Sequence, residues 1–186
     1  NRSLVKETIL LLKDAEDPVL AFVPSDTEDA KADFRRFKEK FAHTNIRHFR
    51  CIPIDRVLSL KKQKELFSSD AIFLGGGNTY YFLKQLRARR LLPKFRAFVK
   101  NGGVLMGLSA GSILMTPNIM TASVPMLDSD ENAVGIKNLS ALGLVPFEFS
   151  PHYFRSKQID QELLEYSKKL EHPIYACADG QGIIVR

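Results

Sequence analysis

The chain has 186 residues, of which 45% are hydrophobic and 26% are charged, and its formal net charge at pH 7 is +6. This length and apolar content suit one substantial core, so we expect residues 1–186 to form a single domain. The sequence has no apolar run long enough to span a bilayer and no evident signal peptide, so we expect a cytoplasmic protein without a membrane partner.

Short apolar runs typical of buried strands alternate along the chain with helical hydrophobic patterns. The predicted strands cover residues 19–24, 47–54, 71–74, 104–108, 144–149 and 174–177. The predicted helices cover residues 3–13, 29–41, 80–91, 93–100 and 159–170. This alternation indicates an α/β fold, with a mainly parallel sheet covered by helices on both faces in a three-layer sandwich.

The motif GLSAG at 107–111 places Ser109 between two glycines, where the strand predicted at 104–108 gives way to a helix. This is the sequence form of a nucleophile elbow, in which glycines relieve crowding and the following amides face the group under attack. Ser109 is therefore our first candidate for a catalytic nucleophile. An ordinary tight strand-to-helix turn remains the alternative.

A second glycine-rich turn, GGGNT at 75–79, follows the strand predicted at 71–74. Because the carboxyl ends of parallel strands meet at one edge of a sheet, we expect this turn to lie beside Ser109. Its backbone N–H groups suit a developing oxyanion, and a phosphate-binding loop or a flexible turn are the alternatives. Neither the Walker motif nor the dinucleotide-binding spacing is present, and we expect no cofactor.

His152 follows the strand predicted at 144–149 and is the histidine best placed to meet Ser109. The other three lie in a basic, polar stretch or precede a proline. A lone histidine is more often structural than catalytic. Its position at the predicted sheet edge nevertheless makes it the candidate general base, because activation of a serine requires an imidazole within hydrogen-bond reach.

Taken together, these motifs resemble the serine-dependent peptidase E family, which includes aspartyl dipeptidases and, more distantly, cyanophycinases. The resemblance rests on GGGNT at 75–79, GLSAG at 107–111, and LGL at 142–144 leading to PHY at 151–153. It implies a flavodoxin-like or class I glutamine amidotransferase-like fold. It also leads us to expect an earlier first strand and a closing hairpin, so terminal strands would be missing from this chain.

The resemblance also implies a role for individual residues. Ser109 corresponds to the nucleophile and His152 to the base. The oxyanion hole would be formed at Gly76, Gly77 and Ala110. The residues expected to bind substrate are Asn78, Thr79, Tyr153 and Arg155.

The acid that orients the histidine is less clear, because relatives usually carry it about one and a half dozen positions after the serine. Asp128 is the nearest acid here, and Asp130 and Glu131 follow closely, although a solvated loop would also account for all three. Asp179 and Gln181, which follow the strand predicted at 174–177, are the alternatives. An orienting group selects the imidazole tautomer, so its replacement weakens catalysis without abolishing it.

A second departure concerns the substrate. Aspartyl dipeptidases of the family carry a Gly-Glu-Thr-Arg-like segment after the histidine, whereas this chain reads YFRSKQ at 153–158. Arg155 and Lys157 suit a substrate carboxylate, and a guanidinium can bind one through two parallel hydrogen bonds. Solvated charges at the start of a helix are the more common role.

Basic clusters such as Arg35-Arg36 and Lys168-Lys169 fall on polar faces of predicted helices, without a nucleic-acid-binding motif. Solvated helix faces explain them better than a nucleic-acid interface, so we expect no nucleic-acid partner, although the positive field favours acidic substrates. The two cysteines, Cys51 and Cys177, are expected as free thiols. The spacing of histidines, cysteines and carboxylates does not indicate a metal site.

These observations predict a serine exopeptidase that acts on short peptides, most specifically an aspartyl dipeptidase, as a monomer or homodimer. One alternative is an isopeptide or amide hydrolase of the cyanophycinase type. The other is a non-catalytic binding protein that retains the fold, which the absence of an acid at the usual position makes plausible.

Overall fold

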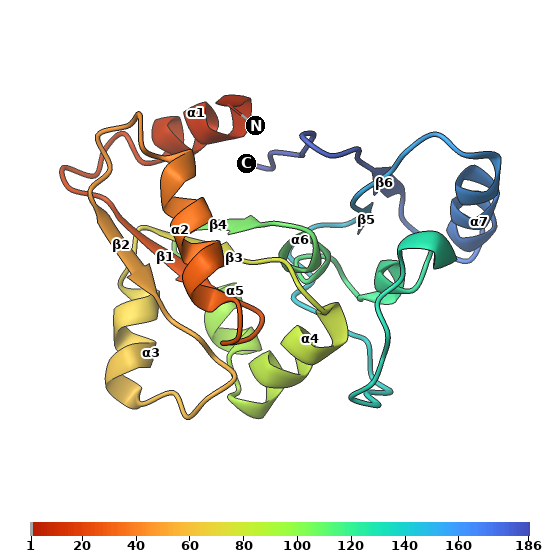
Figure 1. Cartoon of the computed structure of the whole chain (residues 1–186), viewed down its shortest axis with the longest axis horizontal. Helices are drawn as coiled ribbons and strands as arrows, with labels where there is room; N and C mark the ends of the chain where they lie inside the picture. Colours follow the sequence, from red (N-terminus) through yellow and green to blue (C-terminus); the bar gives the residue numbers. More distant parts are fainter. Residues whose placement is uncertain (1) are drawn as a thin grey trace.

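The computed structural model describes residues 2–186, so the first residue of the expected domain lies outside it (Figure 1). A four-stranded sheet of order β2-β1-β3-β4 forms the centre, and β5 and β6 form a second, two-stranded sheet. Every pair of neighbouring strands in these two sheets is parallel. The strands are β1 (Val19–Val23), β2 (His48–Cys51), β3 (Ala71–Leu74), β4 (Val104–Gly107), β5 (Glu148–Ser150) and β6 (Ile174–Ala176).

Helices connect the strands and cover both faces of the central sheet, which confirms the predicted α/β architecture. No helix within residues 2–186 has the length and apolar character needed to cross a membrane. The α-helices are α1 (Arg2–Leu11), α2 (Ala30–Lys40), α3 (Leu60–Phe67), α4 (Thr79–Ala88), α5 (Leu92–Lys100), α6 (Ala110–Ile113) and α7 (Lys157–Ser167). The 3-10 helices are η1 (Met120–Ala122) and η2 (Met126–Asp128).

The alternation of side chains along β1 divides the core into two layers. Leu20 and Phe22 point to the layer formed with α1 and α2, where the ring of Phe22 lies 5.3 Å from that of Phe37. Ala21 and Val23 point to the opposite layer, formed with α3, α4, α5 and α6. Strand residues are therefore apolar on both sides, as expected for a parallel sheet buried between helices.

Three elements differ clearly from the prediction, and the first is the strand predicted at 47–54, which is reduced to the four residues of β2. Helix α3 was not predicted, because its sequence is dominated by lysine, glutamine and glutamate and it buries only Leu66 completely. The strand predicted at 144–149 is reduced to the three residues of β5. Its apolar beginning belongs to a loop in which Leu142 and Leu144 donate backbone hydrogen bonds to Leu114 and Met115.

The register of the sheet brings the two glycine-rich turns together. Val23 pairs with Leu74, and Leu74 pairs with Gly107, so β1, β3 and β4 end side by side. The glycine-rich turn after β3 and the GLSAG motif after β4 consequently lie at the same edge, as expected from the parallel order.

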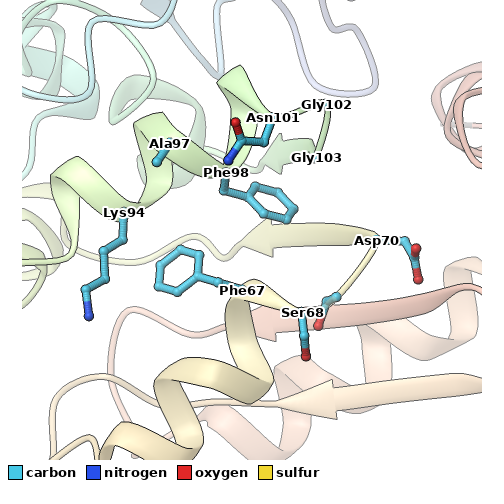
Figure 2. A pocket seen from close by; sticks show the side chains of 10 residues that line it. Phe67, Ser68, Asp70, Lys94, Ala97, Phe98, Asn101, Gly102 and Gly103 are labelled. Atoms are coloured by element: carbon cyan, nitrogen blue, oxygen red, sulfur yellow. The ribbon is translucent and has the colours of Figure 1, made fainter.

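The opposite edge of the sheet contains a hollow of about 550 Å³ (Figure 2). Its lining includes Phe67, Phe98 and Lys94, together with Asp70 and Gly103, which immediately precede β3 and β4. Because these two residues mark the amino ends of the strands, the hollow is separated from Ser109 by the length of the sheet. It is therefore not the candidate catalytic site.

Candidate active site

Ser109 occupies a strained turn between β4 and α6. Its backbone has φ 50° and ψ −115°, a conformation that typically costs about 1–3 kcal/mol in a residue other than glycine. Gly111 makes the turn possible, because a Cβ there would lie 2.3 Å from the carbonyl oxygen of Leu74. The turn is held against β3 by a 3.1 Å hydrogen bond from the Gly111 N–H to the Gly75 carbonyl.

Three side chains form a hydrogen-bonded series at this turn. The Oγ of Ser109 lies 2.9 Å from Nε2 of His152, and Nδ1 of His152 lies 2.6 Å from Oδ1 of Asp179. An acceptor at Nδ1 favours the tautomer with its proton there, which leaves Nε2 free to accept a proton from the serine. The side chains of His152 and Asp179 are 39% and 85% exposed, so water screens their attraction and the hydrogen-bond geometry is the more important contribution.

The pairing of β5 with β6 explains why the histidine and the acid meet. Ser150 pairs with Ala176, and Cys177 continues the ladder by donating to the Ser150 carbonyl and accepting from Tyr153. His152 lies between these two hydrogen bonds with φ 57°, so its side chain leaves the ladder at this point. Asp179, two positions beyond Cys177, reaches the imidazole from the neighbouring strand.

Three backbone N–H groups, in the glycine-rich turn and directly after Ser109, have no partner among the described residues. Within the described chain, no group accepts a hydrogen bond from the N–H of Gly76, Gly77 or Ala110. A Cβ on Gly76 would lie 3.6 Å from the Cβ of Ser109, so the glycine segment passes next to the candidate nucleophile. Gly77 has φ 118° and a Cβ there would lie 2.0 Å from Oγ of Ser25, so this position requires glycine.

The structure places Asp179, and not Asp128, against the imidazole. Asp128 is exposed on η2, and the residues around it are hydrogen-bonded to α4 and α7. On the α7 side, the Met126 N–H donates to Glu162 at 2.7 Å. The expectation that Asp128 orients the histidine is therefore corrected, and the alternative that follows the last predicted strand is the one in contact.

The other candidate orienters also have different partners. The Asp130 carboxylate accepts a hydrogen bond from the backbone N–H of Thr79, and the Glu131 carbonyl accepts one from the Asn78 side chain. The side-chain oxygen of Gln181 accepts from the N–H of Ala178, in the turn that follows β6. These three residues therefore shape loops around the site.

Most of the side chains expected to bind substrate are either hydrogen-bonded or buried within the fold. Asn78 caps α4 by accepting from the Tyr81 N–H, and the Thr79 side chain is buried. The Tyr153 hydroxyl donates to Asp160 at 2.7 Å, and this hydrogen bond raises the pKa of the tyrosine. Arg155 is exposed in the segment between β5 and α7, where its side chain is accessible to a ligand.

A buried acid that sequence reasoning missed lies two residues before Ser150. Glu148 is completely buried and accepts hydrogen bonds from Asn118 at 2.6 Å, His172 at 3.0 Å and Thr116 at 3.2 Å. Burial, followed by the charge of Glu148, raises the pKa of Tyr166 to about 12. A glutamate in an otherwise apolar strand, followed by a histidine that precedes the next strand, was the available signal.

The described residues contain no group of three or more histidine, cysteine, aspartate or glutamate side chains arranged to hold a metal ion. The cysteines Cys51 and Cys177 are both unpaired thiols. Burial raises the pKa of each thiol, so neither is activated as a nucleophile. Ser109 is accordingly the candidate nucleophile that the geometry favours.

The fold and the site define an α/β protein with a serine, a histidine and an acid hydrogen-bonded in series at the carboxyl edge of a parallel sheet. Comparison with known proteins agrees with this class. The family model described as "Peptidase family S51" matches residues 1–186. The chain therefore belongs to peptidase family S51.

Individual relatives match part of the chain. An uncharacterized peptidase of Listeria monocytogenes is 33% identical over 125 residues, which cover 66% of this chain and 59% of that protein. A peptidase E of Salmonella arizonae is 38% identical over 86 residues, which cover 46% of this chain and 34% of that protein. These matches thus leave a large part of each relative uncovered.

Two solved structures share the fold. A candidate peptidase E from Listeria monocytogenes EGD-e superimposes with a TM-score of 0.74 at 22% identity, covering 96% of this chain and 86% of the other. A peptidase from an acI-B1 actinobacterium gives a TM-score of 0.64 at 14% identity, covering 95% and 72%. The likeness extends over nearly all of this chain, so it confirms the architecture as a whole.

Proposed function

We propose that this protein is a serine peptidase that hydrolyses short peptides, with dipeptides bearing an N-terminal aspartate as the preferred substrates. The observation that carries the proposal is the series Ser109, His152 and Asp179, with both hydrogen bonds no longer than 2.9 Å. Membership of peptidase family S51 supports the chemistry. Some relatives are named peptidase E, which supports the narrower assignment.

The mechanism follows from the positions of these groups. His152 accepts the proton of Ser109 as the serine oxygen attacks the scissile carbonyl, and Asp179 stabilises the imidazolium that forms. The free N–H groups of Gly76, Gly77 and Ala110 bind the oxyanion. His152 then gives its proton to the leaving amine, and water hydrolyses the acyl-enzyme by the same steps in reverse order.

The preference for an acidic residue is supported by charge. Arg155 is exposed three positions after His152, and the chain carries a formal net charge of +6. A guanidinium is suited to a carboxylate, and a positive field raises the local concentration of acidic peptides. The alternative of a non-catalytic binding protein was suggested by the absence of an acid at the usual position. Asp179 contacts His152, so this argument for the alternative no longer holds.

The direct test is hydrolysis of Asp-X, Glu-X, Ala-X and β-aspartyl dipeptides by the purified protein and by the Ser109→Ala variant. We expect cleavage of Asp-X, with turnover lowered at least about 10³-fold in the variant because the nucleophile is lost. Equal melting curves would show that the variant is folded. Cleavage of β-aspartyl peptides alone would favour the isopeptide alternative, and no cleavage by folded wild-type protein would contradict the proposal.

A further inference from the structure

The Asp130 carboxylate holds the far end of the glycine segment 75–77. Its Oδ2 accepts a 2.7 Å hydrogen bond from the backbone N–H of Thr79, the first residue of α4. That N–H has no partner within the helix, and a negative charge complements the positive end of the helix dipole. The carboxylate thus secures Thr79, which lies one residue after the cap Asn78 and two residues after Gly77.

The chain that leads from Ser109 to Asp130 also holds the near end of the glycine segment, at Gly75. The Gly75 carbonyl accepts from the Gly111 N–H at 3.1 Å, within the turn that carries Ser109. Farther along, the Asp130 N–H donates to Ala122 at 2.7 Å, which ties the carboxylate to η1. Residues 109–131 therefore carry the nucleophile and fasten both ends of the glycine segment beside it.

A second contact reinforces the far end. The Asn78 side chain donates from Nδ2 to the Glu131 carbonyl at 2.8 Å, while its Oδ1 caps α4. Because this contact uses the backbone of Glu131, Asp130 is, among the described residues of this stretch, the one whose side chain hydrogen-bonds the turn at 75–79. Removing the Asp130 carboxylate therefore tests its hydrogen bond to Thr79 and leaves the backbone of residues 109–131 intact.

We infer that Asp130 is a positioning residue, which fixes the N–H groups of Gly76 and Gly77 where they bind the oxyanion. The inference rests on the proposed function. Two glycines in succession have wide conformational freedom, so their N–H directions depend on how the segment is anchored. Donors must lie about 2.7–3.1 Å from the oxyanion, which exists only in the transition state, so loss of the anchor lowers kcat more than it raises KM.

A fluorophosphonate probe tests the positioning role of Asp130 without a known peptide substrate. The Ser109 oxygen forms a bond to phosphorus, fluoride leaves, and the serine proton passes to His152, while the phosphonyl oxygen lies in the oxyanion hole. We expect the labelling rate constant to fall about 10- to 100-fold in Asp130→Ala. Asp130→Asn should recover most of the rate, because its amide oxygen can accept the same N–H.

Two variants control for general effects. Asp128→Ala removes a neighbouring exposed acid, and Ser59→Ala removes the side chain that caps α3 by accepting from Lys62 at 3.2 Å. The second loses a helix cap of the same kind far from the nucleophile, so it isolates the effect of stability. Both should label within about twofold of the wild-type rate, as expected for substitutions outside the site.

The outcomes separate the inference from the proposed function. Wild-type labelling at Ser109 with an unchanged rate in Asp130→Ala would overturn the inference and leave the peptidase proposal standing. An equal fall in Ser59→Ala would also overturn it, since stability would then explain the loss. Absence of labelling in folded wild-type protein would instead overturn the proposed function. With a cleaved peptide, the inference requires a lower kcat and a KM within about twofold.

Discussion

The acid that contacts His152 lies largely in water. With its side chain 85% exposed, Asp179 contributes through the direction of one hydrogen bond more than through charge. The proximity of Ser109 and His152 could be predicted from sequence, because both follow strand ends in recognisable motifs. The acid that contacts His152 could not be predicted in the same way. It depends on the register of β5 against β6, which brings Asp179 and not Asp128 to the imidazole.

Asp179→Asn tests the orienting role. The amide can donate to Nδ1 and so favours the tautomer that presents a proton, instead of a lone pair, to Ser109. We expect kcat on the cleaved peptide to fall about 10²- to 10⁴-fold, with an unchanged melting temperature because the pair is exposed. Asp128→Asn, the matched control, should retain full activity. A larger loss of kcat in Asp128→Asn than in Asp179→Asn would contradict the orienting role of Asp179.

At the scale of elements, the prediction succeeded where burial produces a regular pattern. The strands at 71–74 and 104–108 were found almost to the residue, because both are apolar and end in glycine-rich turns. Helix α3 was missed because only Leu66 among its residues is completely buried, so the surrounding charges hide the helical period. The contact between β3 and α6 was beyond prediction, because it depends on the space around Gly111.

Gly111→Ala tests that contact. The new Cβ would lie 2.3 Å from the Leu74 carbonyl oxygen, so α6 must move away from β3. We expect a loss of about 1–3 kcal/mol, or roughly 2–12 °C in melting temperature, together with loss of activity as Ser109 shifts. Gly76→Ala is the control for stability, since its Cβ would lie 3.6 Å from the Cβ of Ser109, the nearest atom outside the adjoining residues. Equal melting temperatures for all three proteins would refute the close approach.

At the scale of the whole molecule, β5 and β6 stand apart from the central sheet, on the side away from β2 (Figure 1). A mainly parallel sheet was predictable, but its division into four and two strands was not, because hydrophobic patterns do not encode strand neighbours. Glu148, in β5, connects the two-stranded sheet to the rest of the molecule. Its carboxylate accepts hydrogen bonds from Thr116 and Asn118, which follow α6, and from His172, which precedes β6. Its complete burial makes each of these contacts costly to lose.

Glu148→Ala should therefore destabilise the protein by about 3 kcal/mol, because buried donors lose their acceptor and a cavity is left. The measurement is the midpoint of urea unfolding at constant m value. Glu148→Gln, which keeps one acceptor oxygen and the volume, should lose less. Glu171→Ala alters an exposed acid beside His172 and should stay within about 0.5 kcal/mol of wild type. A comparable loss at Glu171 would argue against the buried network.

The candidate nucleophile and the candidate base follow strands of different sheets. Ser109 follows β4, whereas His152 and Asp179 follow β5 and β6, so the 2.9 Å contact between Ser109 and His152 spans the junction of two structural units. A small rotation of one unit against the other would separate these two residues while leaving the imidazole and its carboxylate paired. Activity is therefore more sensitive to the relative position of the two units than any measurement of secondary structure.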